Sequence, residues 1–390
     1  MFATQNSSLI CIIAAVLSPS AATGSAPVYP EHQDLSYYIN RCGTKCGIQS
    51  VCDWRIRRRH ILANMQRVMG PLPKPRRPVP LAVRIVETKT FDGFVRKKIT
   101  YHTDSKVRRV SAYLFLPTGD GNRKRAAVLC LHQTTGIGKK EPAGIGGKPN
   151  LYYALHLAKR GYVTLAPDYP SFGDDRFDFA PRHGYLSGTM KAVYDNIRAV
   201  DLLQSLPQVD PRRIGCIGHS LGGHNTMFTA AFEPRIKVLV SNCGFTRFHK
   251  YYGGKLRGWT SKRYMPLIAS RYGNDPNKVP FDFTEIVAAF APRPFLAGAP
   301  LRDSNFEVSG VKDVIAAAKP IYRLYCKADH LQANYPDCAH DFPPDVRKTA
   351  YEFLDKHLRH TPRHRKPPIG RRRTSQAGSA VRTTGCELCP

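Results

Sequence analysis

Short apolar runs alternate with amphipathic stretches between residues 127 and 336 of the chain. The apolar runs, each of a length typical of a buried strand, are 127–132, 162–168, 213–220, 236–244, 293–300 and 331–336. Apolar positions recur at helical spacing in 151–161, 190–206 and 221–232, which lie between those runs. Strands that alternate with helices predict the α/β class: a mostly parallel, doubly wound sheet with helices on both faces.

Other patterns precede this alternation. Residues 52–69 place apolar side chains near helical spacing, which predicts an amphipathic helix packed on the main domain. The sequence "GPLPKPRRPVP" at 70–80 ends that helix. Residues 81–91, 94–103 and 110–117 are alternating or rich in β-formers, so we expect them to be the entry strands of the sheet.

An aromatic and basic stretch at 245–290 interrupts the alternation. An insertion at this point could form a small cap over a site and line it with Tyr251, Tyr252, Trp259 and Tyr264. Packing of the same side chains on the surface is an equally good interpretation of the pattern.

The sequence "GHSLGG" at 218–223 places a serine between glycines, after one apolar run and before one helical pattern. A hydroxyl is a weak nucleophile at neutral pH, so a catalytic serine needs a neighbouring base and an exposed position. Gly218 and Gly222 would remove the side chains that collide in a sharp strand-to-helix turn with Ser220 at its crest. A glycine-rich loop that merely contains a serine is the alternative.

The longer sequence "GCIGHSLGGH" resembles the nucleophile elbow of the α/β-hydrolase superfamily. That resemblance implies a triad in the chain order Ser, Asp or Glu, then His. His340, in "NYPDCAHDF" after the last apolar run, is the base that this order implies. Asp303, just beyond the preceding run, is the acid that would orient His340.

Three other aspartates are rivals for the role of the acid. Asp329 comes before the last apolar run, at the opposite edge of the expected sheet. Asp341 is adjacent in sequence to the histidine that it would have to face, and Asp168 precedes the serine in the chain. The resemblance therefore favours Asp303, with helix capping or a turn as its alternative role.

An oxyanion hole is also implied by the resemblance. One donor would be the backbone N–H of Leu221, directly after the serine. The other would come from the loop after 127–132, where many relatives have His-Gly. This chain reads "HQTTG", so Gln133 or Thr134 is the candidate and the second donor stays open.

Residues 79–360 are similar to the dienelactone hydrolase and acetyl xylan esterase (cephalosporin deacetylase-like) branch, on the sequences "LAPDYPSFGDD" and "APRP". Dienelactone hydrolases use a cysteine nucleophile, whereas this chain has Ser220. The resemblance therefore implies a serine esterase that forms an acyl-enzyme. Its substrate would carry a small acyl group on a small molecule or a carbohydrate. No cofactor and no metal are implied.

Two alternative functions remain open from the sequence. The first is a serine peptidase like prolyl oligopeptidase, which shares this catalytic core but usually carries a large propeller domain. The second is a hydrolase fold without catalysis that binds an anionic polymer through its basic flanks, because a fold does not guarantee a reaction.

The net charge of +30 favours anionic partners such as an acidic polysaccharide. Residues 52–78 and 359–390 each contain eight basic side chains and a single acidic one. The rest of the chain is also basic, and a generic solvated surface is the simpler interpretation. No nucleic-acid-binding motif accompanies the charge.

Residues 1–26 resemble a signal peptide, with the apolar run "LICIIAAVL" at 9–17 followed by small residues but no basic start. We therefore expect export, with no transmembrane segment; a disordered start is the alternative. Residues 27–78 would form an N-terminal extension, 79–360 the catalytic domain and 361–390 a disordered basic tail.

Five cysteines lie near the termini: Cys42, Cys46, Cys52, Cys386 and Cys389. Some could form disulfides in an exported protein, and a zinc site is conceivable, although the usual paired ligand spacing is absent. The glycine-rich sequence at 136–150 fails as a phosphate-binding loop because prolines occupy two of its key positions. No nucleotide is therefore expected.

Overall fold

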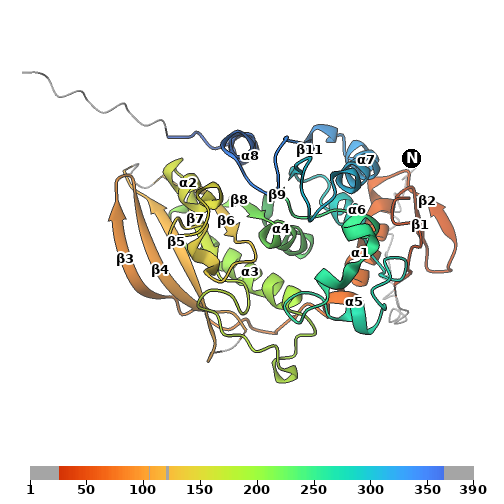
Figure 1. The fold of residues 1–390 in the computed structure, drawn as a ribbon, viewed down its shortest axis with the longest axis horizontal. Coiled ribbons are helices and arrows are strands. Elements are labelled where there is room, and N and C mark those ends of the chain that lie inside the picture. The colour runs from red at the N-terminus through yellow and green to blue at the C-terminus, as the bar shows by residue number, and fades with distance from the viewer. Residues whose placement is uncertain (1–25, 105, 120–122, 364–390) are drawn as a thin grey trace, which may run out of the picture.

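A nine-stranded sheet forms the centre of the computed structural model, which describes residues 26–104, 106–119 and 123–363 (Figure 1). Its strand order is β11-β10-β9-β8-β6-β7-β5-β4-β3. The strands are β3 (Arg84–Phe91), β4 (Phe94–His102), β5 (Arg109–Pro117), β6 (Arg125–Leu131), β7 (Val163–Pro167), β8 (Val209–His219), β9 (Ile236–Asn242), β10 (Phe295–Gly298) and β11 (Leu331–Asn334).

The sheet combines an antiparallel entry with a parallel core. β3, β4 and β5 pair antiparallel, and β5 joins the rest by antiparallel pairing with β7. All pairs from β7 to β11 are parallel. Every residue of β6 and β7 is buried, as expected for strands covered on both faces.

Helices cover both faces of this sheet. The long helices are α1 (Val51–Met69), α3 (Gly188–Ser205), α4 (Leu221–Phe232), α7 (Val308–Leu324) and α8 (Pro344–Leu358); the short ones are α2 (Tyr153–Lys159), α5 (Leu267–Ser270) and α6 (Phe283–Ala288). Apolar side chains of α2 and α8 form one core cluster with Val128, Ile217 and Val240. Those of α3 and α4 pack with Leu129, Cys216 and Leu239, the alternate residues of the same strands. Because successive side chains of a strand point to opposite faces of the sheet, each of these strands contributes to both cores.

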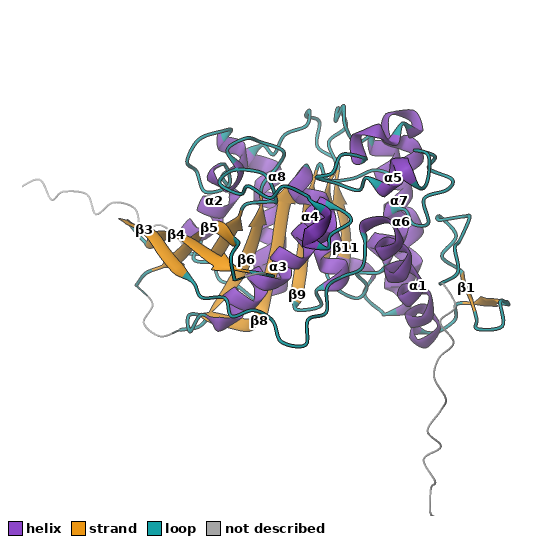
Figure 2. Cartoon of the chain, turned by 90° about the horizontal axis from the view of Figure 1, so that it is seen from below, coloured by secondary structure: helices purple, strands orange, loops and turns teal. Residues whose placement is uncertain are grey.

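The N-terminal extension packs against the β11 side of the domain. It contains a hairpin of β1 (Tyr37–Ile39) and β2 (Lys45–Gly47), followed by α1. Figure 2 shows α1 beside α6 and α7, at the end of the sheet where β11 lies. Ser50 and Asp53 form a capping box at the start of α1, and Gly70 at φ 93° ends it.

A buried ion cluster ties the extension to α6. Glu285, in α6, accepts from the Arg57 guanidinium through Oε1 and from His32 Nδ1 through Oε2, both at 2.8 Å. His32 Nε2 lies 3.0 Å from the carbonyl oxygen of Val279. Both contacts of the imidazole are acceptors, so both nitrogens can donate only when His32 is protonated. Burial alone would lower the pKa of His32, but the hydrogen bond and charge of Glu285 outweigh it and raise that pKa.

We expect the His32 contribution to stability to depend on pH. Because the folded-state pKa is raised, the contribution is complete below the ordinary value of about 6.5 and is lost as pH rises through the folded pKa. His32→Ala should lower the free energy of unfolding by about 1–3 kcal/mol near pH 5.5 and by less near pH 9.5, in urea titrations. His32→Gln, which cannot be protonated, should remove the same pH dependence. An equal loss at both pH values would contradict the charged pair.

The α/β class and the doubly wound sheet that the sequence predicts are confirmed. The predicted strands and helices correspond to β3 to β11 and to α1 to α4, with shifts of a few residues at their ends. The pattern does not identify the β1–β2 hairpin, α7 or α8. α7 contains Pro320, and a proline inside a segment normally indicates that no helix continues through it.

Several expectations fall on the ends of the chain. Residues 1–25 of the expected signal peptide and 364–390 of the expected tail lie outside the described residues, as do Cys386 and Cys389. Cys42, Cys46 and Cys52 are free thiols. Among the described helices, none is both long and apolar enough to cross a membrane.

Candidate active site

The catalytic candidates gather where parallel strands end at one edge of the sheet. β6 has β7 on one side and β8 on the other, so the chain winds in opposite directions from β6. Loops diverge at such a switch point and leave room for a ligand. Thr134, from the loop after β6, and Ser220, after β8, line the same cavity there.

Ser220 occupies a sharp turn between β8 and α4, with φ 53° and ψ −118°. A non-glycine residue at positive φ is strained, and such strain is typical of nucleophile elbows. The Ser220 backbone N–H donates to the carbonyl of Asn242 at 2.9 Å, which anchors the turn to the end of β9. The side chain of Ser220 is half-buried at the cavity wall.

The two glycines of the motif are required by close backbone approach. A Cβ on Gly222 would lie 1.9 Å from the carbonyl oxygen of Leu131, and a Cβ on Gly218 would lie 2.1 Å from that of Gly222. Neither neighbour is a flexible side chain. The spacing of the motif therefore follows from the packing of β6, β8 and the first turn of α4.

Gly222→Ala is expected to destabilise the protein by about 3 kcal/mol or more, because the backbones of α4 and β6 would have to separate. Urea unfolding followed by far-UV circular dichroism measures this loss. Gly136→Ala is the control: a Cβ there would meet nothing within 4 Å, so we expect a change within about 0.5 kcal/mol. Equal stability of the two variants would show that the turn tolerates a side chain.

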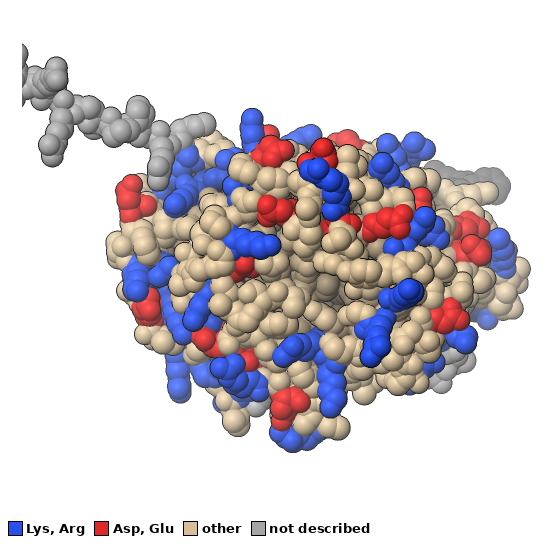
Figure 3. Space-filling model, viewed as in Figure 1, with Lys and Arg blue, Asp and Glu red and all other residues tan. Residues whose placement is uncertain are grey.

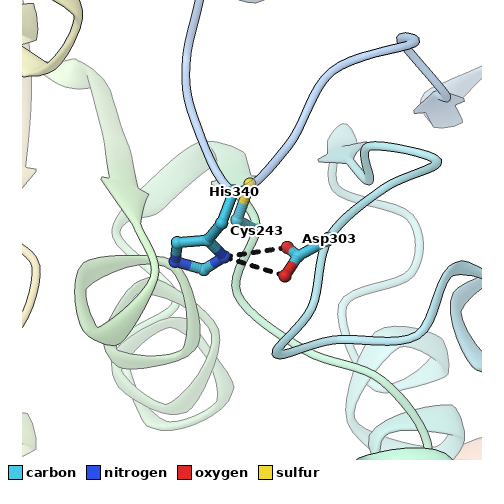
Figure 4. Close-up of side chains that lie close together, drawn as sticks. All are labelled: Cys243, Asp303 and His340. Carbon is cyan, nitrogen blue, oxygen red and sulfur yellow. Dashed lines mark hydrogen bonds and ion pairs between the residues drawn. The ribbon is translucent and has the colours of Figure 1, made fainter.

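His340 and Asp303 form a hydrogen-bonded pair across two loops (Figure 4). His340 Nδ1 lies 2.9 Å from both carboxylate oxygens of Asp303. The Asp303 side chain is 1% exposed and that of His340 is 19% exposed, so the carboxylate is buried behind the ring. The His340 ring lies 4.8 Å from the ring of His219, the residue directly before Ser220. The pair therefore stands beside the elbow.

Cys243 is a third side chain at this pair, and no sequence pattern pointed to it there. It follows β9 at φ 48°, and its thiol contacts the carbonyl of Asp341 at 3.5 Å. Burial and then the charge of Asp303 raise the pKa of Cys243 well above its usual value, which keeps the thiol protonated. Ligand atoms of Cys243, Asp303 and His340 all lie within 4.8 Å of one another. Among the described residues a zinc ion could be held here only if it displaced the proton of the Cys243 thiol, because zinc binds the thiolate.

The rival aspartates lie elsewhere. Asp168 is buried in an ion pair with Lys139, at 2.6 Å. Asp341 turns its carboxylate to the amide of Asn150 at 2.6 Å. Asp329 belongs to a short 3-10 helix, Ala328–His330, that precedes β11. Of the four, Asp303 is the one that contacts His340.

The candidates for the second oxyanion donor differ in their surroundings. The Gln133 side-chain amide donates to Glu141 at 2.9 Å. Thr134 lies in the cavity wall, where its hydroxyl is 2.9 Å from that of Tyr264. Leu221, whose N–H is the first candidate donor, also lines the cavity.

The cavity beside Ser220 has a volume of about 130 Å³, and four of its ten lining residues are Tyr, Trp or Phe. Its lining residues are Thr134, Ser220, Leu221, His224, Tyr251, Gly258, Trp259, Tyr264, Asn305 and Phe306. Three of the four aromatic residues expected from the 245–290 insertion are thus present. Tyr252 is not: it is 51% exposed, and its hydroxyl donates to Asn305. His224, Asn305 and Phe306 were not expected, and for His224 the signal was its place one helical turn after the serine.

The fold and this site define a serine hydrolase with the α/β-hydrolase architecture. The chain belongs to the prolyl oligopeptidase family. The model of this family matches residues 150–361, which are more than half of the chain. The superfamily that the elbow resembles is confirmed.

Individual curated proteins and solved structures are also similar to this chain. The chain is 30% identical over 215 residues to "Putative hydrolase YtaP" of Bacillus subtilis, covering 53% of this chain and 68% of that protein. It is 29% identical over 185 residues to acetyl esterase Axe7A of Xylanibacter ruminicola, covering 42% of this chain but only 39% of that protein. A solved glucuronoyl esterase from Solibacter usitatus has the same fold, with a TM-score of 0.62 at 17% identity over 85% of this chain and 99% of its own.

Proposed function

We propose that this serine hydrolase cleaves carboxylic esters through a triad of Ser220, His340 and Asp303. The observation that carries the proposal is the pair of 2.9 Å contacts between His340 Nδ1 and the buried carboxylate of Asp303, beside the elbow. With Nδ1–H donating to Asp303, Nε2 of His340 is left with a lone pair that can accept the serine proton.

The reaction then has two halves. Ser220 attacks the ester carbonyl as His340 removes its proton, and the protonated imidazole returns that proton to the leaving alcohol. Asp303 holds the ring and stabilises its positive charge. The backbone N–H of Leu221 and one from the Gln133–Thr134 loop would stabilise the oxyanion. Water then attacks the acyl-enzyme, with His340 again as the base, and the acid is released.

The substrate that we propose carries a small acyl group on either a simple alcohol or a carbohydrate. A cavity of about 130 Å³ is smaller than the roughly 300–1,000 Å³ of a typical ligand pocket, which supports a small acyl group over a long chain. Axe7A is an acetyl esterase by name, and the Solibacter usitatus protein is a glucuronoyl esterase, so both relatives are esterases that support this class.

Covalent labelling tests the nucleophile directly. Incubation with a fluorophosphonate should modify Ser220 in stoichiometric amount, as located by peptide mass spectrometry, and should stop hydrolysis of p-nitrophenyl acetate. Acetate esters should be cleaved faster than butyrate esters. Labelling at another serine would refute the triad, and a strong preference for butyrate would refute the small acyl pocket.

A peptidase is the second candidate, because the family model is that of prolyl oligopeptidase. The described residues before β3 form a two-stranded hairpin and one helix and contain no propeller. A fluorogenic Gly-Pro substrate compared with p-nitrophenyl acetate separates the two activities. Faster turnover of the peptide would favour the peptidase.

Export and an anionic partner are further parts of the proposal. Lys and Arg side chains are spread over the face shown in Figure 3, with Asp and Glu among them. This distribution supports weak, salt-dependent attraction to an acidic polysaccharide that bears the ester. Recovery of a mature protein without residues 1–26, by N-terminal sequencing, tests export. Binding to acidic polysaccharide without any ester turnover would instead favour the non-catalytic alternative.

A further inference from the structure

Strand β3 forms an open edge of the central sheet. It stands last in the strand order and pairs with β4 on one side only. Figures 1 and 2 show no described element beyond it. Alternate N–H and C=O groups of β3 therefore point away from β4, and among the described residues they have no backbone partner on that side. Such an edge is a template for pairing with another strand.

The side chains of β3 are exposed as well as its backbone. Seven of its eight residues are exposed, whereas every residue of β6 and β7 is buried. Three of the exposed residues are large and apolar: Ile85 at 58%, Val86 at 59% and Phe91 at 41%. A single exposed apolar side chain is ordinary, but several along one free edge favour contact with another chain.

The charges on β3 indicate which strand can pair with it. Glu87 and Lys89 are two residues apart and therefore lie on the same face of the sheet, 40% and 57% exposed. A lysine on an edge strand normally discourages pairing with other strands. A strand that pairs here must therefore place a carboxylate opposite Lys89 and a cation opposite Glu87.

We infer that this strand is β3 of a second copy of the chain, paired antiparallel about Thr88. In that register Thr88 faces itself across a two-fold axis, and Glu87 of each copy faces Lys89 of the other. Directly opposed residues share a face of the sheet, so the neighbouring registers centre on Glu87 or on Lys89. Each of those registers sets two like charges opposite each other, which is destabilising. The register about Thr88 instead forms two ion pairs, and one sheet continues through both copies.

The same register covers the apolar side chains that β3 exposes. Residues 85–86 of one copy lie beside residues 90–91 of the other, and the two-fold axis repeats this contact on both sides of Thr88. Pairs of aromatic and β-branched side chains on neighbouring strands stabilise a sheet. The register of β3 against β4 shifts between Ile85 and Glu87, so the central part of the new pairing, 87–89, lies in the regular part of the strand.

Sedimentation velocity and hydrogen exchange on the full chain test the pairing. Each copy carries a net charge of +30, so the measurements are made in about 0.15 M salt, where a Debye length of about 8 Å screens long-range repulsion. We expect a concentration-dependent dimer with twice the 43.6 kDa mass of one chain. Amides of residues 84–91 should exchange more slowly at high protein concentration than at low. A monomer at every concentration, or a dimer without this protection, would overturn the inference.

Exchange of the two charges tests the register. Glu87→Lys places lysines opposite each other at two points of the dimer and should raise its dissociation constant by about tenfold or more. Lys89→Glu should have the same effect through opposed carboxylates. The double variant Glu87→Lys/Lys89→Glu restores opposite charges, so its dissociation constant should return to within about threefold of wild type. Lys319→Glu, an equal change of charge at an exposed position of α7, is the control and should leave the dimer unchanged.

The outcomes separate this inference from the proposed function. Neither Glu87 nor Lys89 lines the Ser220 cavity, so both single variants should hydrolyse p-nitrophenyl acetate at the wild-type rate. A dimer that is insensitive to either single exchange, or that the double exchange fails to restore, would place the interface on another surface and overturn the inference. Absence of ester hydrolysis would refute the proposed function and leave the test of the dimer intact.

Discussion

Replacing Ser220 with alanine is expected to lower kcat for p-nitrophenyl acetate at least about 10³-fold, and by as much as 10⁶-fold. Without the hydroxyl no acyl-enzyme can form, and only binding and the oxyanion donors remain to assist attack by water. Alanine keeps the Cβ and therefore the same backbone strain, and the Ser220 side chain has no structural partner among the described residues that alanine would lose, so the free energy of unfolding should change little. Steady-state assays on the two purified proteins measure the ratio of their kcat values.

Ser309→Ala is the matched control for this change, because Ser309 lies on the exposed start of α7 and pairs with Glu307. It should retain wild-type kcat. Equal activity in Ser220→Ala and wild type would mean that another protein in the preparation, or another site, hydrolyses the ester.

Asp303→Asn is the second large effect that we expect, a fall in kcat of about 10³- to 10⁴-fold with a small change in KM. The carboxylate accepts from His340 Nδ1–H, and so fixes the tautomer that leaves Nε2 free. An asparagine amide can donate to Nδ1 instead, which moves the ring proton to Nε2 and removes the base. Steady-state kinetics with p-nitrophenyl acetate measures this loss.

Asp341→Asn makes the same chemical change one residue after the histidine and should lower kcat less than tenfold, because that carboxylate contacts Asn150. A larger loss in Asp341→Asn than in Asp303→Asn would show that our proposal assigns the role of the acid to the wrong residue. Unfolding in urea should be followed for both, since Asp303 also accepts the backbone N–H of Asn305 and of Phe306.

The sequence by itself determined the parts of this protein that depend on neighbours along the chain. The strand before Ser220, the turn and α4 are contiguous, and α4 has the bounds that the pattern at 221–232 predicts. The alternation of short apolar runs with helical patterns was enough for the α/β class, because burial on both faces makes parallel strands uniformly apolar. The glycines at 218 and 222 were readable for the same local reason.

Only the tertiary structure decided which distant residues meet. Asp303 and His340 are 37 positions apart, and four aspartates were compatible with local rules until the order of β9, β10 and β11 brought one of them to Nδ1. Cys243 reached the same pair because it directly follows β9, which neighbours β10 in the sheet, and His224 met Trp259 because the 245–290 insertion folds over α4. Spacing along a chain constrains contacts within one turn or one hairpin, whereas contacts between loops depend on how the sheet sets its strands side by side.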